Sequence, residues 1–314
     1  MLKSIVHHLL DRSIYYAFDA TGFDRHAAAF DPDDGAVDLS GKVCLVTGAN
    51  SGIGKATALS LARSNATVLL LCRSEARGLE AKRLIQAEAG HDRVHVEVVD
   101  MARLRSVCDL ADRLQGERID VLIHNAGALL STRTMTEDGL ETTWATHVAG
   151  PFLLTKRLIP RLATGARVIF VSSGGMYTQR LDLTDVAWHE RPFDGVVAYA
   201  QAKRAQVILS ELWAERLGDR ALVAAMHPGW VNTPGVEQAL PRFYRFTRNR
   251  LRTPAQGADT VIWLAKAPAA RLESGRFWFD RKVASTHLMK RTKETESDRL
   301  GLWKLCEEMT VDKS

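Results

Sequence analysis

The chain has 314 residues, of which 46% are hydrophobic and 25% are charged, and its formal net charge is +5. These values are typical of a globular protein with one large core. The positive charge is too mild and too scattered to indicate a nucleic-acid-binding protein. No run of 18 apolar residues, which a membrane-spanning helix would need, occurs in the sequence.

Residues 1–40 are predicted to form an N-terminal amphipathic arm. Charged residues and histidines interrupt this segment too often for a signal peptide. A helix packed on the protein's own domain is the first interpretation, and docking of residues 1–18 on a membrane surface is the alternative. The apolar residues at helical spacing that carry both interpretations are Leu2, Ile5, Val6, Leu9 and Leu10.

From residue 41 onward, short apolar runs alternate with longer segments of helical periodicity. Continuous apolar strands separated by helices predict a parallel sheet that is covered on both faces. No repeat or Pro/Gly linker divides the chain, so residues 41–314 are expected to form a single α/β domain with a doubly wound, Rossmann-type sheet. The predicted strands are 42–47, 66–72, 93–99, 119–124, 166–172 and 221–227, and the clearest helical segments are 52–64, 75–89 and 137–162.

The first predicted strand ends in a glycine-rich turn, "TGANSGIG", which leads into a helix. We expect Gly48 to permit the tight turn, Gly52 to let the backbone approach a diphosphate, and Gly54 to let helix and strand pack closely. The amino end of the helix offers free N–H groups and a positive dipole end to phosphate. In this position, the turn predicts a dinucleotide site.

The end of the second strand bears on the choice of nucleotide. An acidic residue there would read the free 2′-hydroxyl of NAD, but this chain has Arg73 and Ser74 in its place. The planar guanidinium group suits a phosphate. Arg73 therefore favours NADP(H), and a surface arginine without a ligand is the alternative interpretation.

Two further strand ends carry polar or small residues. Asp100 closes the third strand, where its carboxylate is placed to accept a hydrogen bond from an adenine amino group, and Met101 follows it. The fourth strand ends in Asn125, followed by Ala126 and Gly127, which leave space for a ribose.

The stretch "AYAQAK" places Tyr199 and Lys203 four residues apart, among good helix formers. On a helix, this spacing brings both side chains to one face. A solvated helix face is one interpretation. The other is a tyrosine whose phenol is tuned for proton transfer by the neighbouring ammonium group.

The loop after the sixth strand is expected to determine substrate specificity, as loops in this position commonly do. We interpret residues 230–255 as a lid with an aromatic lining and a basic rim, which would suit a bulky apolar substrate; a solvated amphipathic helix is the alternative. The basic residues are Arg242, Arg245, Arg248, Arg250 and Arg252, and the apolar ones are Phe243, Tyr244, Phe246 and Leu251.

Taken together, these features resemble the short-chain dehydrogenase/reductase superfamily, over about residues 41–278. Within it, stretches such as "HPGWVNTPGV" and "SGRFWFDRK" look most like the group called dehydrogenase/reductase family member 12. The motifs that carry the resemblance are Thr47-Gly48-x-x-x-Gly52-x-Gly54, Asn125-Ala126-Gly127, "VSS" ending at Ser173, Tyr199-x-x-x-Lys203 and Pro228-Gly229.

The resemblance implies roles for three catalytic residues. Tyr199 would be the general acid in carbonyl reduction and the general base in alcohol oxidation. Ser173, rather than Ser172, would hold the substrate oxygen. Lys203 would bind the nicotinamide ribose and, together with the positive nicotinamide, lower the pKa of the phenol from its ordinary value of about 10.

His147 stands where the family pattern has a fourth catalytic residue, an asparagine, in "THVAGPF". The family residue acts largely through its main-chain carbonyl, which holds a water in the proton relay. Histidine can itself transfer protons near pH 7. Participation of the His147 side chain in the relay and a tolerated replacement therefore both stay open.

The sequence thus predicts an NADP(H)-dependent carbonyl reductase or alcohol dehydrogenase that acts on a small molecule, and a homo-oligomer is possible. A nucleotide-binding protein that lacks turnover and acts through partners is the alternative. The residues expected to contact the cofactor are Gly48, Asn50, Ser51, Gly52, Ile53, Gly54, Arg73, Asp100, Met101, Asn125, Ala126, Gly127, Tyr199, Lys203, Pro228, Gly229, Val231 and Thr233.

Overall fold

The computed structural model describes residues 10–11, 13–31, 34 and 37–311. Its centre is one eight-stranded sheet with the order β3-β2-β1-β4-β5-β6-β7-β8. All pairs are parallel except β7 with β8. The strands are β1 (Val43–Thr47), β2 (Thr67–Cys72), β3 (Val94–Val98), β4 (Ile119–His124), β5 (Leu162–Val171), β6 (Ala221–Met226), β7 (Phe277–Phe279) and β8 (Lys282–Val283).

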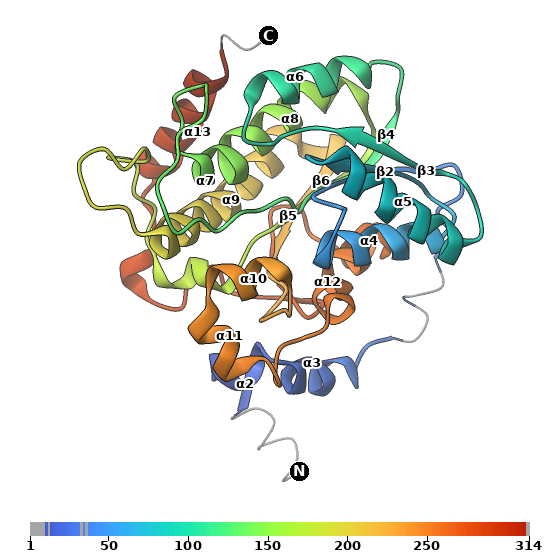
Figure 1. Ribbon diagram of the computed structural model, residues 1–314, viewed down its shortest axis with the longest axis horizontal. Coiled ribbons are helices and arrows are strands. Elements are labelled where there is room, and N and C mark those ends of the chain that lie inside the picture. The colour runs from blue at the N-terminus through green and yellow to red at the C-terminus, as the bar shows by residue number, and fades with distance from the viewer. Residues whose placement is uncertain (1–9, 12, 32–33, 35–36, 312–314) are drawn as a thin grey trace.

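The sheet is the middle of three layers, as the sequence predicted (Figure 1). One core lies between the sheet and α4, α5 and α12, and the other between the sheet and α6, α8, α9 and α13. The helices after β1 are α4 (Gly52–Arg63), α5 (Glu75–Ala89), α6 (Leu104–Arg113), α7 (Thr142–Trp144), α8 (Gly150–Leu158), α9 (Gly195–Leu217), α10 (Pro234–Ala239), α11 (Pro241–Thr247), α12 (Pro254–Lys266) and α13 (Glu296–Thr310).

The strands are buried on both faces, which explains their continuous apolar sequences. In β1, for example, Cys44, Leu45 and Val46 are all fully buried, and Cys44 pairs with Val68 of β2 and Val121 of β4. The four cysteines are buried, and none of them forms a disulfide. Burial raises the pKa of the Cys44 thiol to about 12, so this group is an inert core residue.

The expected helix over residues 137–162 is wrong at both ends. Residues 137–141 are not helical, and a π-helical turn (Ala145–Ala149) separates α7 from α8. Leu162 already belongs to β5, four residues before the expected start of that strand. Proline at position 160 ends the helical segment, because its ring and missing N–H disfavour a continuing helix.

The N-terminal arm packs against the carboxyl end of the sheet. Its described part contains α2 (Ile14–Ala17) and α3 (Ala20–Ala27), which lie beside α11 at the bottom of Figure 1. The expected apolar residues Leu2, Ile5, Val6 and Leu9 lie outside the described residues. Within the described part of the chain, no helix is long and apolar enough to cross a membrane.

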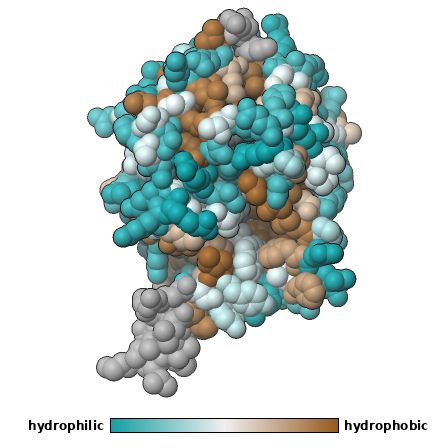
Figure 2. Space-filling model, turned by 90° about the vertical axis from the view of Figure 1, so that its left-hand side faces the viewer, coloured by the Kyte–Doolittle hydropathy of each residue, from teal (hydrophilic) through white to brown (hydrophobic). Residues whose placement is uncertain are grey.

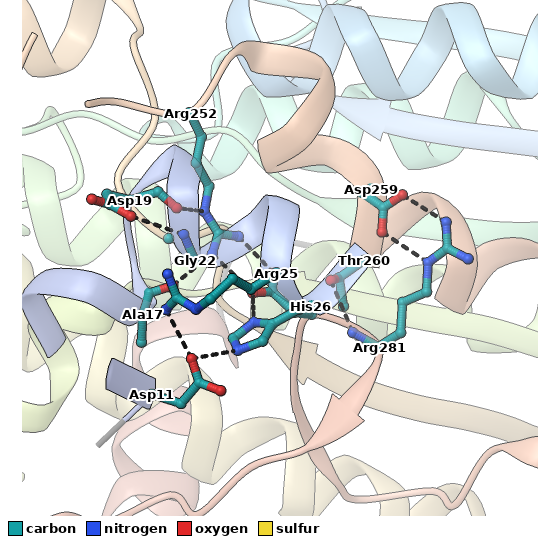
Figure 3. A network of polar contacts seen from close by, with 12 residues as sticks. Asp11, Ala17, Asp19, Gly22, Arg25, His26, Arg252, Asp259, Thr260 and Arg281 are labelled. Carbon is teal, nitrogen blue, oxygen red and sulfur yellow. Dashed lines mark hydrogen bonds and ion pairs between the residues drawn. The ribbon is translucent and has the colours of Figure 1, made fainter. Parts of the chain in front are cut away.

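Buried charges join the arm to the domain. The Arg252 side chain, 1% exposed, forms a two-pronged ion pair with Asp280 (2.6 and 2.8 Å) and donates to the main-chain oxygens of Ala17 and Asp19. His26 of α3 also contacts Asp280, at 2.6 Å. Figure 3 shows how the arm residues converge on Arg252.

Two arginines that we expected on a basic lid rim are therefore structural. Arg252 is buried, and Arg250 pairs with the fully buried Asp19, which also caps α3 by accepting from the Gly22 N–H. Both are part of the joint between the arm and the domain. Arg242, Arg245 and Arg248 are exposed, as both the lid and the alternative of a solvated amphipathic helix predict.

The turn between β7 and β8 explains the position of Asp280. Asp280 and Arg281 both have positive φ angles, 47° and 60°. Two such residues between paired antiparallel strands form the tight hairpin turn that the strand twist favours. Aspartate tolerates this conformation better than most residues do, and in this turn its carboxylate meets Arg252 and His26.

Candidate active site

The predicted glycine-rich turn lies between β1 and α4 and is held by the end of β4. Gly48 has a positive φ of 67°, and a Cβ atom there would lie 2.9 Å from the Ala126 Cα atom. A Cβ atom on Gly54 would collide with the Asn125 side chain and with the Gly48 carbonyl group. Both glycines are therefore required for close approach of the backbone, as the sequence predicted.

Asn125 is a structural element of this turn. Its side-chain Nδ2 donates to the Thr47 carbonyl oxygen at 2.9 Å, and the N–H groups of Asn125 and Ala126 donate to the Thr47 hydroxyl. These bonds tie the carboxyl ends of β1 and β4 together. Gly127 follows, and a Cβ atom there would lie 2.7 Å from the His147 ring.

The amino end of α4 is arranged to bind an anion. Ser51 occupies the N-cap position but makes no side-chain capping bond, and Gly52 and Ile53 begin the helix. The first N–H groups of a helix have no partner within the helix and point outward with the positive end of its dipole. The 12-residue α4 thus presents donors where a diphosphate would bind.

A cavity of about 190 Å³ adjoins this helix end, and it carries two cations that sequence reasoning missed. Asn50, Ser51, Lys55 and Arg77 contribute to its lining. Lys55 lies on the first turn of α4, and Arg77 lies on the first turn of α5, three residues after its N-cap Ser74. The sequence did contain a signal for Arg77, because this basic residue lies on the first turn of the helix that follows β2.

Arg73 lies directly after β2 and is exposed. It is not part of the cavity lining, whereas Arg77 is. The end of β2 and the first turn of α5 thus each carry an arginine, and the acidic residue that would read a free 2′-hydroxyl is absent from the strand end.

Asp100 and Met101 follow β3. One Asp100 carboxylate oxygen accepts from the Ala102 N–H at 3.0 Å, and the Asp100 N–H donates to Ser106. These bonds fix the turn into α6. Met101 is buried, and its carbonyl oxygen lies where a Cβ atom on Gly150 would be.

The end of β5 distinguishes the two serines of "VSS". Ser172 is buried, and its hydroxyl donates to the Lys203 carbonyl oxygen of α9 at 2.9 Å, which is a structural contact. Ser173 is partly exposed and forms a side-chain hydrogen bond with Tyr199. The geometry therefore agrees with Ser173, rather than Ser172, as the residue that faces a substrate.

Tyr199 and Lys203 lie one turn apart on α9, as predicted. Asp194 starts this helix by accepting from the N–H groups of Val196 and Val197. The Lys203 ammonium group is buried, donates to the Val171 carbonyl oxygen at 2.8 Å and to Gln206 at 2.9 Å, and lies 5.6 Å from the centre of the Tyr199 ring. The lysine is thereby fixed at the end of β5.

The pKa values differ from the expectation that Lys203 lowers the pKa of Tyr199. Burial raises the pKa of Tyr199, and the hydrogen bond with Ser173 offsets part of this effect. Burial also lowers the pKa of Lys203 to about 7, so its charge near neutral pH is only partial. Without a bound cation the phenol is therefore protonated at neutral pH, which is the state a general acid requires.

His147 is fully buried in the π-helical turn. Its Nε2 atom lies 2.9 Å from the Ala128 carbonyl oxygen and 3.1 Å from the Ala128 nitrogen. Its ring meets the Tyr199 ring edge-on, with the centres 5.2 Å apart. Burial, followed by the nearby charge of Lys203, lowers the pKa of His147 well below 6.5.

This lowered pKa argues against a titrating relay histidine, which is one of the two roles that the sequence left open for His147. A neutral imidazole that holds Ala128 and packs on Tyr199 is a positioning group in this structure. The main-chain role that the family resemblance implies for this position would not depend on the side chain.

The loop after β6 closes the site. Gly229 has a φ of 75°, the Pro228 carbonyl oxygen accepts from Arg252, and Val231 pairs with Arg252 in an isolated bridge. Thr233 caps α10, and its methyl carbon would lie 3.2 Å from a Cβ atom on Gly52. The loop therefore reaches the glycine-rich turn, as expected for residues near a bound nucleotide.

Comparisons with known proteins agree with this geometry. The family model described as short chain dehydrogenase matches residues 42–242. Dehydrogenase/reductase SDR family member 12 from Homo sapiens is 45% identical over 276 residues, which cover 86% of each chain. Retinol dehydrogenase 14 from Mus musculus is 35% identical over 292 residues, again 86% of each chain. The chain therefore belongs to the short-chain dehydrogenase/reductase family.

Solved structures show the same fold. A protein from Mycobacterium paratuberculosis matches with a TM-score of 0.72 and 29% identity, over 88% of this chain and 96% of the other. An Escherichia coli CFT073 protein described as a short chain dehydrogenase, solved in complex with NADPH, matches with a TM-score of 0.64 and 25% identity, over 80% and 100% of the two chains. The fold is a Rossmann fold, and the protein is an oxidoreductase of this family with a site that fits a nicotinamide dinucleotide.

Proposed function

We propose that the protein is an NADP(H)-dependent oxidoreductase that interconverts a carbonyl compound and an alcohol, with Tyr199 as general acid in reduction and general base in oxidation. The observation that carries the proposal is the joint geometry of Ser173, Tyr199 and Lys203. The serine and tyrosine share a hydrogen bond, and the lysine is fixed one helical turn away.

The chain's own residues supply binding and proton transfer. The cofactor, when bound, supplies or accepts the hydride. Ser173 binds the substrate oxygen and stabilises the negative charge that develops on it, and the protonated Tyr199 hydroxyl delivers the proton. Lys203 supports the tyrosinate that remains, because a positive charge nearby favours the ionised phenol.

The preference for NADP(H) follows from the basic groups at the end of β2. Arg73 remains our first candidate for the 2′-phosphate, and the cavity beside the glycine-rich turn adds Lys55 and Arg77. Arginine can bind phosphate through two parallel N–H donors, and lysine adds a point charge. The NADPH complex of the similar Escherichia coli structure is consistent with this preference.

The substrate is proposed to be a bulky apolar carbonyl compound or alcohol. The loop that follows β6 carries aromatic side chains of α11, and Trp230 packs edge-on against Phe243 with ring centres 5.2 Å apart. A relative with 35% identity is named a retinol dehydrogenase, which names an apolar alcohol for that protein. These observations support the substrate class.

Three further expectations belong to the same proposal. The protein is expected in a cytoplasmic, reducing compartment, because its four cysteines are buried and form no disulfide. The second expectation is that the protein forms a homo-oligomer. The third is that residues 1–18 make a peripheral contact with a membrane.

A nucleotide-binding protein without turnover is the second candidate, and His147 in place of the family's asparagine favours it. The intact Ser173, Tyr199 and Lys203 favour an enzyme. NADPH oxidation with a panel of aldehydes and ketones, from short aliphatic to bulky apolar compounds, distinguishes the two. Turnover of at least one compound is expected, and none across the panel, with NADPH bound, would contradict the enzyme.

The proposed role of Tyr199 as proton donor is tested with a compound from the panel that the protein reduces. Tyr199→Phe removes only the hydroxyl group, so NADPH should bind while kcat falls by about two to four orders of magnitude. Tyr16→Phe, a matched change of an exposed tyrosine on α2, should leave kcat unchanged. Near-normal turnover of Tyr199→Phe would show that the proposed proton donor is wrong.

A further inference from the structure

Gln206 is a polar side chain of α9 that has no role in the mechanism described above. Polar and charged residues mostly lie at the surface of a protein, and Figure 2 shows hydrophilic residues over much of one face of the molecule. Gln206 and Lys203 are instead only 1% and 3% exposed. Burial of such groups is unfavourable unless hydrogen bonds replace the lost contacts with water.

The hydrogen-bond partner of Gln206 is the ammonium group of Lys203. The Oε1 atom of Gln206 accepts from Nζ of Lys203 at 2.9 Å, and the Val171 carbonyl oxygen at the end of β5 accepts from the same atom at 2.8 Å. Gln206 and Lys203 are three positions apart on α9, a spacing that brings two side chains together on one face of a helix. One acceptor thus comes from the main chain, and the other comes from the Gln206 side chain.

These two acceptors leave one donor of the lysine unused. An ammonium group has three N–H donors, and two of them point to Val171 and Gln206. The third is available for the nicotinamide ribose, which is the contact that the family resemblance implies for Lys203. The same group lies 5.6 Å from the centre of the Tyr199 ring.

Lys203 forms no ion pair within the described part of the chain, and burial lowers its pKa to about 7. Two titratable groups face it, Tyr199 on α9 and His147 on the π-helical turn. Burial raises the pKa of Tyr199 and lowers that of His147 well below 6.5, so both groups are neutral near pH 7. From β5, the main-chain carbonyl of Val171 faces the lysine. The Gln206 oxygen is therefore the side-chain atom that favours the charged form of Lys203.

The nitrogen of the same amide makes no comparable contact. Nε2 of Gln206 is buried and has no hydrogen-bond partner among the described residues. A buried donor without a partner lowers stability, and an apolar side chain of similar length would avoid this cost. Packing at this position thus does not require an amide, whereas the bond to Lys203 requires an acceptor.

We propose that Gln206 is a positioning residue for Lys203, whose charged ammonium group it holds at the end of β5 with one N–H left for the nicotinamide ribose. This inference rests on the proposed function, because it concerns the lysine of that site. An amide suits the task, since its oxygen favours the charged lysine and adds no negative charge that would cancel it.

The experiment measures the Kd of NADPH by fluorescence titration from about pH 6 to 9. A charged donor forms a stronger hydrogen bond than a neutral one, so the Kd of the wild type should rise as Lys203 loses its proton. Gln206→Met removes the acceptor and should move the midpoint of this rise to lower pH. Gln206→Glu keeps an acceptor, adds a negative charge and should move the midpoint to higher pH. Each shift should be about 0.5 pH unit or more.

The matched control is Gln201→Met, because Gln201 lies on the same helix and accepts from Arg191 instead of Lys203. Its midpoint should equal that of the wild type. Gln206→Met removes a buried donor that has no partner, so this variant should fold, which urea denaturation checks.

The direction of the two shifts separates positioning from a general disturbance of the helix. Midpoints of Gln206→Met and Gln206→Glu that equal the wild-type value, or that move in the same direction, would overturn the proposal, as would a wild-type Kd that does not change with pH. Opposite shifts would support it. Because binding is measured without a substrate, opposite shifts in a protein that reduces none of the panel compounds would support the role of Gln206 and contradict the proposed enzyme.

Discussion

The two ends of this molecule use charged residues in opposite ways. At the glycine-rich turn, the basic Arg73 and Arg77 are exposed, and the helix N-terminus keeps its donors directed outward. At the arm, Arg252, Asp280 and Asp19 are almost fully buried and are paired with one another or with nearby side chains and main-chain oxygens. The charges at the first end are open to solvent, and the charges at the other join two parts of the chain.

The difference has a physical reason. A buried charge without a partner is expensive, so charges inside a protein must be matched by other charges or by hydrogen bonds. An exposed arginine has no such requirement and stays available for a phosphate. We therefore expect substitutions at the arm to alter folding stability, and substitutions at the turn to alter ligand affinity.

The largest expected effect is at Asp280. Asp280→Asn keeps the shape and tolerates the positive φ angle, but it leaves the buried Arg252 charge without a counter-ion. Breaking one side of a buried ion pair costs about 3 kcal/mol or more, which urea denaturation would show as a loss in the free energy of unfolding.

The matched control is an exposed pair. Arg105 and Asp109 form an i,i+4 ion pair with side chains 72% and 46% exposed. Asp109→Asn should change the free energy of unfolding by less than about 0.5 kcal/mol. If Asp280→Asn and Asp109→Asn lowered the free energy of unfolding equally, the buried ion pair at the arm would not stabilise the protein more than an exposed pair, and the comparison would be wrong.

The same carboxylate predicts a pH dependence. Burial alone would raise the pKa of Asp280, but the hydrogen bonds from His26 and Arg252 outweigh it and hold the pKa below its usual value of 3.8. A depressed pKa in the folded state contributes stability that is present above about pH 4 and is lost as the pH falls through the folded-state pKa.

The wild type and Asp280→Asn should therefore differ in their free energy of unfolding by a constant amount from pH 5 to 8. This difference should become smaller below about pH 4. Urea denaturation at a series of pH values measures it. A difference that is unchanged down to pH 3 would show that the carboxylate charge is not what joins the arm to the domain.

His147 should give a smaller effect on kcat. His147→Ala removes the partner of Ala128 and the ring that packs on Tyr199, so kcat should fall about tenfold, which corresponds to 1.4 kcal/mol. The inflections of the pH–rate profile should stay in place in both His147→Ala and His147→Asn, because the buried imidazole is neutral over the measured range. An inflection near pH 6.5 that disappears in both variants would restore the relay hypothesis.

The sequence predicted the parts that depend on local pattern. The bounds of β4 and α5 agree with the prediction to the residue, and Tyr199 and Lys203 share a helix as their spacing indicated. Hydrophobic periodicity and turn residues act over a few positions, and both can be read from one sequence. The roles predicted for Ser173, Tyr199 and Lys203 came instead from the resemblance to the family, because periodicity places a residue on an element and does not assign its chemistry.

The sequence did not reveal the joint between the arm and the domain. Asp19 and Arg250 are 231 positions apart, and no local pattern indicates that they pair. The depressed pKa of Lys203 and of His147 was missed because burial depends on packing around both residues in three dimensions. Both features depend on contacts between distant segments, which periodicity does not encode.

The proposed nucleotide site at the glycine-rich turn is tested most directly by the affinity of the wild-type protein for NADPH and for NADH. Fluorescence titration should show NADPH bound at least tenfold more tightly than NADH, a difference of about 1.4 kcal/mol. Arg73→Asp should reverse or abolish this preference, and Arg77→Ala should weaken NADPH and leave NADH nearly unchanged. Equal Kd values of the wild type for NADPH and NADH would contradict the account of this end as a site for the 2′-phosphate.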